Sequence, residues 1–186
     1  AGTYQASTGQ SSCDDADAGY YVSTSAASTQ TACATGTWQN ETGQSSCKNA
    51  AAGYYSEGTV GGTGVTVTSV ATSQTPCAAG KYQAGTAESS CDTAIAGYYS
   101  PGTVGASTVD SSVTTAATSQ IPCAAGTYIA ASGASSCTDA VSGYYSLGTT
   151  IVNGVATNTA TSQTSCPEGT YQASTGQSSC DDADAG

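Results

Sequence analysis

Apolar side chains are sparse in this chain and recur at fixed places between long polar stretches. Leu, Ile and Val together number 16 of 186 residues, Phe is absent, and all 13 aromatic residues occupy repeated positions. No segment has apolar residues at the 3.6-residue period of a helix, and frequent Gly with β-branched Thr and Val disfavours helix. The pattern therefore predicts short β hairpins and loops.

Two segments carry β signals of their own. Residues 65–68 (Val-Thr-Val-Thr) alternate apolar and polar side chains beside several glycines, which predicts a short hairpin. Asn153-Gly154 lies between β-branched residues, and Asn-Gly in that setting is a strong type I′ turn signal. We interpret both segments as β excursions from a repeated body.

One bracketed loop recurs along the whole sequence. Residues 33–47 are CATGTWQNETGQSSC, similar segments start at Cys77, Cys123 and Cys166, and a truncated copy ends at Cys13. Gly2–Gly19 is identical to Gly169–Gly186, an offset of 167 residues, so four repeats form one superperiod. We expect a partial repeat at 1–32, repeats at 33–76, 77–122 and 123–165, and the start of the next superperiod at 166–186.

Each repeat has a second half that opens with Gly-Tyr-Tyr. In the first of these halves, Ala16 and Gln30 are 14 positions apart, the same separation as Cys33 and Cys47. An Ala and a Gln recur together in the later repeats, where the second half is longer. Joint loss of both cysteines is expected if they formed a disulfide, because one orphan thiol is a liability. The primitive unit is therefore 17 residues long.

Composition limits the class of protein. With so few apolar residues, a single large core cannot offset the chain entropy lost on folding. The chain has 13 acidic residues, two Lys and no Arg or His, for a net charge of -11. Nucleic acid is therefore not expected as a partner, because phosphate binding requires clustered basic residues.

The cysteines indicate an oxidising compartment. Nine cysteines at fixed spacing in so small a core favour disulfides, and zinc is disfavoured because no His and no C-x-x-C pair is present. No signal peptide and no run of about 18 apolar residues that could cross a membrane is found. The sequence starts and stops in mid-repeat, so we expect a segment of a longer secreted chain that is not inserted in a membrane.

The motif C-x-x-G-T-Y-x-x-x-x-G-x-S-S-C, followed at short distance by x-x-G-Y-Y, resembles ephrin-receptor-like cysteine-rich repeats. Those repeats belong with the TNF-receptor-like and growth-factor-receptor-like modules of extracellular proteins. The resemblance covers the whole chain as tandem copies. It implies four disulfides, Cys33–Cys47, Cys77–Cys91, Cys123–Cys137 and Cys166–Cys180, and leaves Cys13 unpaired in this sequence, its expected partner lying before Ala1.

The chain also departs from that family. The family usually continues C-x-x-C, whereas this chain has alanine at the later cysteine position: Ala16, Ala50, Ala94 and Ala140. The change halves the bridge density and argues against a receptor-type ligand surface. Long tandem arrays of this kind are similar to those of microbial and protist surface and filament proteins.

The repeated aromatic positions predict a small core in each repeat. We expect rings to stack on the disulfides and on each other, with one Tyr of each pair buried and its neighbour partly exposed. The alternative is an exposed ladder of rings that binds a sugar or a partner. The predicted core residues are Tyr4, Trp38, Tyr82, Tyr128 and Tyr171 and the first member of each pair, Tyr20, Tyr54, Tyr98 and Tyr144.

Two kinds of modification or ligand site are suggested. Asn40-Glu41-Thr42 is the only Asn-x-Ser/Thr sequon, and Ser/Thr tracts such as residues 23–25 and 114–115 suit O-glycosylation. The stretch Asp14–Asp17 has a faint similarity to a calcium loop. An acidic, solvated link accounts for it better, because calcium requires six to eight oxygen ligands.

Catalysis has no support in the sequence, which lacks His and Arg and has no convergent pair of carboxylates, and no cofactor is expected. We therefore expect a small disulfide-rich, mainly β chain, with tandem hairpins and loops stacked into an elongated rod. Its expected role is structural, in an extracellular filament or cell-surface stalk that carries glycans and associates with itself. The alternatives are an adhesin or receptor-type ligand-binding segment, and an adhesin stiffened by calcium.

Overall fold

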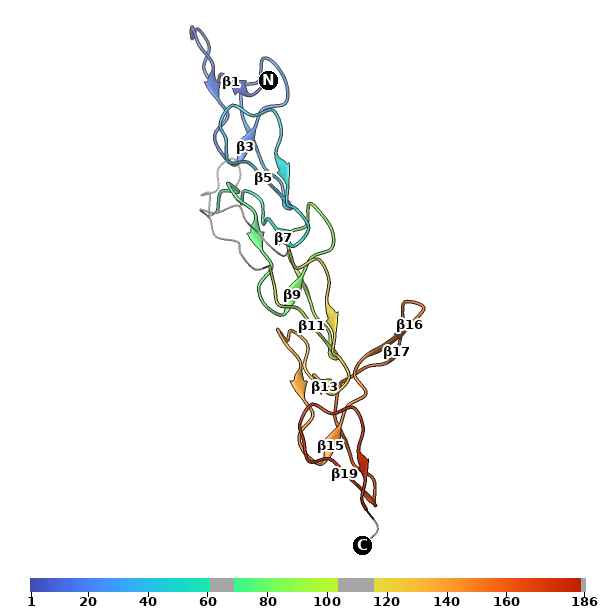
Figure 1. Ribbon diagram of the computed structural model, residues 1–186. Coiled ribbons are helices and arrows are strands. Elements are labelled where there is room, and N and C mark those ends of the chain that lie inside the picture. The colour runs from blue at the N-terminus through green and yellow to red at the C-terminus, as the bar shows by residue number, and fades with distance from the viewer. Residues whose placement is uncertain (61–68, 104–115, 185–186) are drawn as a thin grey trace. The chain divides into compact units, whose positions relative to one another are not determined.

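The computed structural model describes residues 1–60, 69–103 and 116–184 (Figure 1). All strands in this part of the chain pair antiparallel, in two-stranded sheets, and most are two residues long. The expected small, disulfide-rich β class is confirmed. The hairpin predicted at residues 65–68 lies outside the described residues.

One local pattern is repeated, which we call a step. A step starts at a Cys or Ala, reaches a glycine three residues later, forms a two-residue strand, loops round, and ends with a second two-residue strand. Steps that start and close with cysteine are cysteine steps: 33–49, 77–93, 123–139 and 166–182. Steps that start with alanine and close with glutamine are alanine steps: 16–32, 50–76, 94–122 and 140–165. The two kinds alternate, so the 17-residue unit expected from the sequence is also the structural unit.

The described residues fall into two compact units. The first contains Ala1–Cys77 and Gln83–Cys91. Its sheets pair the strands β1 (Thr3–Tyr4) with β2 (Asp14–Asp15), β3 (Tyr20–Tyr21) with β4 (Thr31–Ala32), β5 (Thr37–Trp38) with β6 (Lys48–Asn49), and β7 (Tyr54–Tyr55) with β8 (Thr75–Pro76).

The second unit contains Ala78–Tyr82 and most of the described chain from Asp92 onward. It pairs β9 (Lys81–Tyr82) with β10 (Asp92–Thr93), β11 (Tyr98–Tyr99) with β12 (Ile121–Pro122), β13 (Thr127–Tyr128) with β14 (Thr138–Asp139), β15 (Tyr144–Tyr145) with β18 (Thr164–Ser165), and β19 (Thr170–Tyr171) with β20 (Asp181–Asp182). Inside the step 140–165, β16 (Thr150–Val152) and β17 (Val155–Asn158) form a further hairpin.

The glycine that opens each first strand is required by its backbone conformation. In every described step its φ lies between +79° and +88°, a region that side chains with a Cβ disfavour. At Gly36 a Cβ would also lie 1.9 Å from the carbonyl oxygen of Ala87, so there is no space for a side chain. The recurrent Gly before the aromatic position therefore meets both a conformational and a packing constraint.

Within each unit, neighbouring steps are joined by the same backbone hydrogen bond. The N–H of the step glycine donates to the carbonyl three residues beyond the glycine of the next step, at 2.7–2.9 Å. Gly19 N–H thus donates to Gln39 O, and Gly36 N–H to Ser56 O. The same bond joins Gly2 to Val22, Gly53 to Gln83, Gly80 to Ser100, Gly97 to Ile129, Gly126 to Ser146 and Gly143 to Gln172.

The small residues that start the steps are among the most buried, except Cys166, which is half-buried. Ala16, Ala50, Ala94 and Ala140 are 0 % exposed, and Cys33, Cys77 and Cys123 are 1 % exposed. Their N–H groups donate to the glycine carbonyl of the preceding step, for example Ala50 to Gly36 at 2.8 Å and Cys33 to Gly19 at 2.9 Å. This position is close to neighbouring backbone, which is why only Ala or Cys occupies it.

The expected aromatic core is largely wrong. Of the nine rings named as core, only Tyr98 is buried, while Tyr144 and Tyr171 are 38 % and 51 % exposed. The remaining six, Tyr4, Trp38, Tyr82, Tyr128, Tyr20 and Tyr54, are half-buried. Backbone hydrogen bonds hold adjacent steps close together, and the small residues at the step starts, rather than the rings, are buried between them.

Candidate functional site

The cysteine loops are closed by disulfides. The bridges Cys33–Cys47, Cys77–Cys91, Cys123–Cys137 and Cys166–Cys180 all have Cα atoms 5.8 Å apart and a sequence separation of 14, and they are the pairs that the resemblance implies. Closing a loop of about 15 residues contributes about 3 kcal/mol through the unfolded chain. Cys13 is exposed and is not bridged to any described residue.

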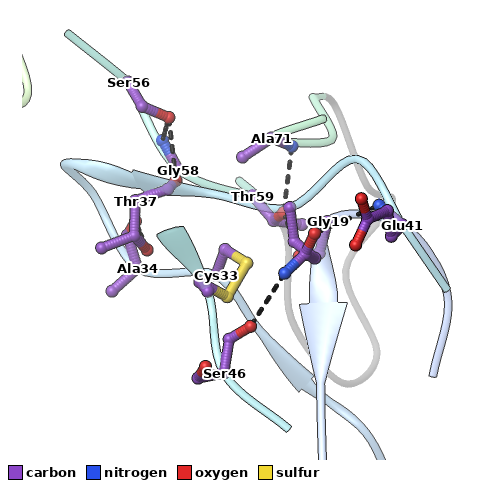
Figure 2. The surroundings of a disulfide bond; sticks show 12 residues. Gly19, Cys33, Ala34, Thr37, Glu41, Ser46, Ser56, Gly58, Thr59 and Ala71 are labelled. Atoms are coloured by element: carbon purple, nitrogen blue, oxygen red, sulfur yellow. Dashed lines mark hydrogen bonds between the residues drawn. A yellow bond between two sulfur atoms is a disulfide. The ribbon is translucent and has the colours of Figure 1, made fainter. Parts of the chain in front are cut away.

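The next step encloses the start of the Cys33–Cys47 bridge (Figure 2). The carbonyl of Cys33 accepts a hydrogen bond from Thr59 N–H at 2.8 Å. The Thr59 hydroxyl donates to Gly19 O at 2.7 Å and accepts from Ala71 N–H at 3.1 Å. Thr59 therefore joins three successive steps around one disulfide. Gly58 beside it has φ +77° and packs so closely that a Cβ would lie 2.6 Å from the Ala34 backbone.

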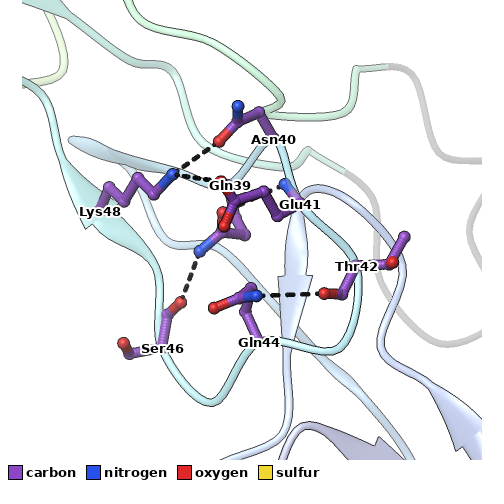
Figure 3. A network of polar contacts seen from close by, with 7 residues as sticks. All are labelled: Gln39, Asn40, Glu41, Thr42, Gln44, Ser46 and Lys48. Atoms are coloured by element: carbon purple, nitrogen blue, oxygen red, sulfur yellow. Dashed lines mark hydrogen bonds and ion pairs between the residues drawn. The ribbon is translucent and has the colours of Figure 1, made fainter.

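Inside the bridged loop, one buried glutamine holds the backbone (Figure 3). Gln39 is only 2 % exposed. Its side chain donates a hydrogen bond from Nε2 to Ser46 O at 3.0 Å and accepts one from Glu41 N–H at 3.2 Å. Gln5, Gln83 and Gln172 make the equivalent pair of bonds in their own loops. The loop that starts at Cys123 has Ile129 at this position and has no such anchor.

A cluster of four side chains sets the loop 33–47 apart from its copies. The Lys48 ammonium lies 2.7 Å from Asn40 Oδ1, 3.6 Å from a Glu41 carboxylate oxygen and 5.3 Å from the centroid of the Trp38 ring. Because the Lys48–Glu41 pair is largely exposed, its contribution to stability is small. Among the described residues, Trp38 Nε1 is the buried side-chain polar atom that has no hydrogen-bond partner.

The sequon lies on this exposed surface. Asn40, Glu41 and Thr42 are exposed, while Gln39 immediately before them is buried and fixes the loop. Lys48 binds the oxygen of the Asn40 amide, and Figure 3 shows the amide nitrogen, the atom that carries an N-linked glycan, turned away from the polar network. The Ser/Thr tract 23–25 is also exposed, and residues 114–115 lie outside the described part of the chain.

The alanine steps close without a disulfide. The Gln that replaces the second cysteine accepts, through Oε1, a hydrogen bond from the N–H of the residue after the starting alanine. These bonds are Asp17–Gln30 at 2.7 Å, Ala51–Gln74 at 2.7 Å, Ile95–Gln120 at 2.9 Å and Val141–Gln163 at 2.8 Å. The sequence indicated the equivalence of the positions, and the structure supplies the bond that replaces the bridge.

The acidic stretch Asp14–Asp17 forms part of a strand and of the neighbouring Gln closure. Asp14 and Asp15 are exposed in β2, and the Asp17 carboxylate accepts from Gln30 Nε2 at 2.7 Å. Within residues 1–60, 69–103 and 116–184, no three His, Cys, Asp or Glu side chains come together as metal ligands.

Sequence reasoning missed the buried polar residues that join the steps. Besides the loop glutamines, the long alanine steps carry Ser-x-Gly-Thr after the Tyr pair, beginning at Ser56, Ser100 and Ser146. These serines are at most 3 % exposed and donate to the carbonyls of Thr37, Lys81 and Thr127 at 2.8 Å. Their recurrence at one offset from the Tyr pair was the available signal.

No family model matches this chain, and no curated protein matches it. In the part of the chain that the structure describes, no helix has the length and apolar character needed to cross a membrane.

Proposed function

We propose that this chain is a structural segment of an extracellular filament or cell-surface stalk, in which disulfide-closed steps are stacked as tandem repeats into an elongated rod. The observation that carries the proposal is the bond from each step glycine to the next step, repeated with the same donor and acceptor positions in both units. In a repeat protein, each unit is completed by its neighbour, and stability adds along the array.

The alternation of the two kinds of closure suits this structural role. From Ala16 to Asp182, Gln closures alternate with covalent bridges, so no pair of neighbouring steps in this range lacks a cysteine bridge. The disulfides favour an oxidising, extracellular location. Acidic and hydroxyl-rich surfaces, with N-glycosylation at Asn40 and O-glycosylation of exposed Ser and Thr, would keep such a segment hydrated and protected. The role requires neither catalysis nor a cofactor.

The proposal is tested by secreting the chain from a eukaryotic host and combining non-reducing peptide mapping with electron microscopy. We expect the four within-loop bridges and uniform thin particles or filaments with a regular axial repeat. Bridges between different loops, or compact particles with no axial repeat, would contradict it. Short uniform particles that bind a ligand saturably would instead favour the adhesin or receptor-type segment.

A further inference from the structure

The β16–β17 hairpin belongs to the second unit, and its apolar side chains are exposed. Figure 1 shows it extending away from the steps that carry it. Its turn has φ +51° at Asn153 and +77° at Gly154, which confirms the Asn-Gly turn expected from the sequence. Ile151, Val152 and Val155 remain 46 %, 50 % and 65 % exposed.

Both faces of this hairpin are apolar. Val152 is opposite Val155, and Ile151 is opposite Ala156, so the two pairs project from opposite faces of the sheet. A two-stranded hairpin alone is only marginally stable in water, and a third strand or further packing is normally needed. The hairpin therefore has surface suited to an additional strand.

The two edges of the hairpin differ. Because Val152 and Val155 flank a two-residue turn, they form the hydrogen-bonded pair, and the N–H and C=O of Ile151 and Ala156 point outward. On β17 the ladder is interrupted, since Thr150 pairs with Asn158 and leaves Thr157 as an extra residue. Such a bulge obstructs pairing at the β17 edge, whereas the three residues of β16 form a regular edge.

Charge favours a second copy of this chain as the occupant. The chain carries a net charge of -11, but residues 140–167 contain no charged residue. Acidic surfaces elsewhere on two copies therefore repel one another, whereas the hairpin presents no like charge to its copy. The edge is also self-complementary, because a strand that pairs antiparallel with its own copy exchanges identical bonds about a two-fold axis.

We infer that two copies pair antiparallel along β16, with Ile151 of each copy donating its N–H to the Ile151 carbonyl of the other. The product is a four-stranded sheet that buries both Ile151 side chains on one face and covers Val152 on the other. The inference deepens the proposed structural function, on which it rests, by assigning a side-to-side contact between chains.

Sedimentation equilibrium of the intact chain tests the pairing. From about 10 µM to about 1 mM, a range suited to a weak contact of this size, the weight-average mass should rise from 18.0 kDa towards twice that value. Ile151→Pro removes the outward N–H and should abolish the rise. Ala156→Pro removes the matching N–H from the other edge and should leave the rise intact. A concentration-independent mass, or equal loss in both variants, would overturn the inference.

A cross-link gives a second readout that does not depend on affinity. In a Cys13→Ser background, Ile151→Cys should form a covalent dimer on mild oxidation, because Cα atoms of a hydrogen-bonded antiparallel pair lie about 5.5 Å apart, within disulfide range. Ala156→Cys should stay monomeric under the same conditions. Monomeric Ile151→Cys protein with all four native bridges intact would refute the pairing while leaving the proposed function standing.

Discussion

Gln30 holds Asp17 through both ends of its side-chain amide. Asp17 N–H donates to Gln30 Oε1 and Gln30 Nε2 donates to Asp17 Oδ2, each at 2.7 Å. In the next step the corresponding closure is the covalent bond between Cys33 and Cys47. The two closures hold the same backbone geometry, because Ala16 N–H and Cys33 N–H each donate to the glycine carbonyl of the preceding step.

The alanine step 16–32 should therefore accept a fifth disulfide. In a Cys13→Ser background, Ala16→Cys with Gln30→Cys should form a bridge spontaneously, since Cys33 fits the equivalent buried site. A loop of this length contributes about 3 kcal/mol, and lost hydrogen bonds of about 1 kcal/mol reduce the gain to about 2 kcal/mol. Denaturant unfolding and non-reducing peptide mapping measure the two effects.

Ala16→Cys alone in the same background is the matched control. It should show one reactive thiol after unfolding and no gain in stability. A double variant that keeps two free thiols, or that is no more stable than the single variant, would mean that the Gln closure and the disulfide closure are not equivalent.

Gly36 should be among the least replaceable positions in the first unit. Gly36→Ala introduces left-handed strain of about 1–2 kcal/mol and a Cβ that meets the Ala87 carbonyl oxygen at 1.9 Å, so the free energy of unfolding should fall by about 3 kcal/mol or more. Trp38 lies two residues away, so its fluorescence on denaturant titration is a suitable local measure.

A matching substitution at Gly143 distinguishes the backbone strain from the steric clash with Ala87. Gly143 occupies the same place in its step with φ +82°, but no described atom lies within 4 Å of a Cβ placed there. Gly143→Ala should therefore cost only the strain, about 1–2 kcal/mol. Equal losses for the two variants would show that packing against Ala87 contributes nothing.

The sequence predicted what depends on local spacing. The β class, the 17-residue unit and the Asn153-Gly154 turn follow from glycine, cysteine and turn chemistry, which act over a few residues. It did not predict that Gln39 and Ser56 are buried, because polar residues are normally expected at the surface. Their burial depends on carbonyls in other parts of the fold, such as Thr37 O for Ser56. The prediction of an aromatic core was wrong because it too depended on contacts between steps, and composition does not show how closely the backbones of neighbouring steps approach.

The loop glutamine provides a test in both directions. Ile129→Gln should stabilise the loop that starts at Cys123 by about 1 kcal/mol, because it adds bonds to Ser136 and Ala131 equivalent to those that Gln39 makes in its own loop. Gln39→Ile should destabilise its own loop by about the same amount. Amide hydrogen exchange of each loop measures the change where it occurs, and protection that moves in the same direction in both variants would contradict the assignment.

Asn40 should carry an N-linked glycan when the chain is secreted from a eukaryotic cell. The sequon is exposed and its amide nitrogen is turned away from the Lys48 network, so peptide N-glycosidase should lower the mass of the secreted chain. Asn40→Gln and Thr42→Ala should each remove the sensitivity, whereas Glu41→Gln, which keeps the sequon, should retain it. Secreted protein with unmodified Asn40 would contradict the prediction.

Ala87 is a position at which the natural residue is not the most stable one. Its φ is +61°, while Gly43, Gly133 and Gly176 occupy the same place in the other cysteine loops. Ala87→Gly relieves strain of about 1–2 kcal/mol and loses about 0.4–1 kcal/mol through the freer unfolded chain, so a net gain of about 0.5–1 kcal/mol is expected. Ala84→Gly, at an exposed position three residues earlier without positive φ, should lose about 0.4–1 kcal/mol. Thermal unfolding of the two variants should therefore shift in opposite directions, and a destabilised Ala87→Gly would mean that the left-handed strain at this loop is relieved by another contact.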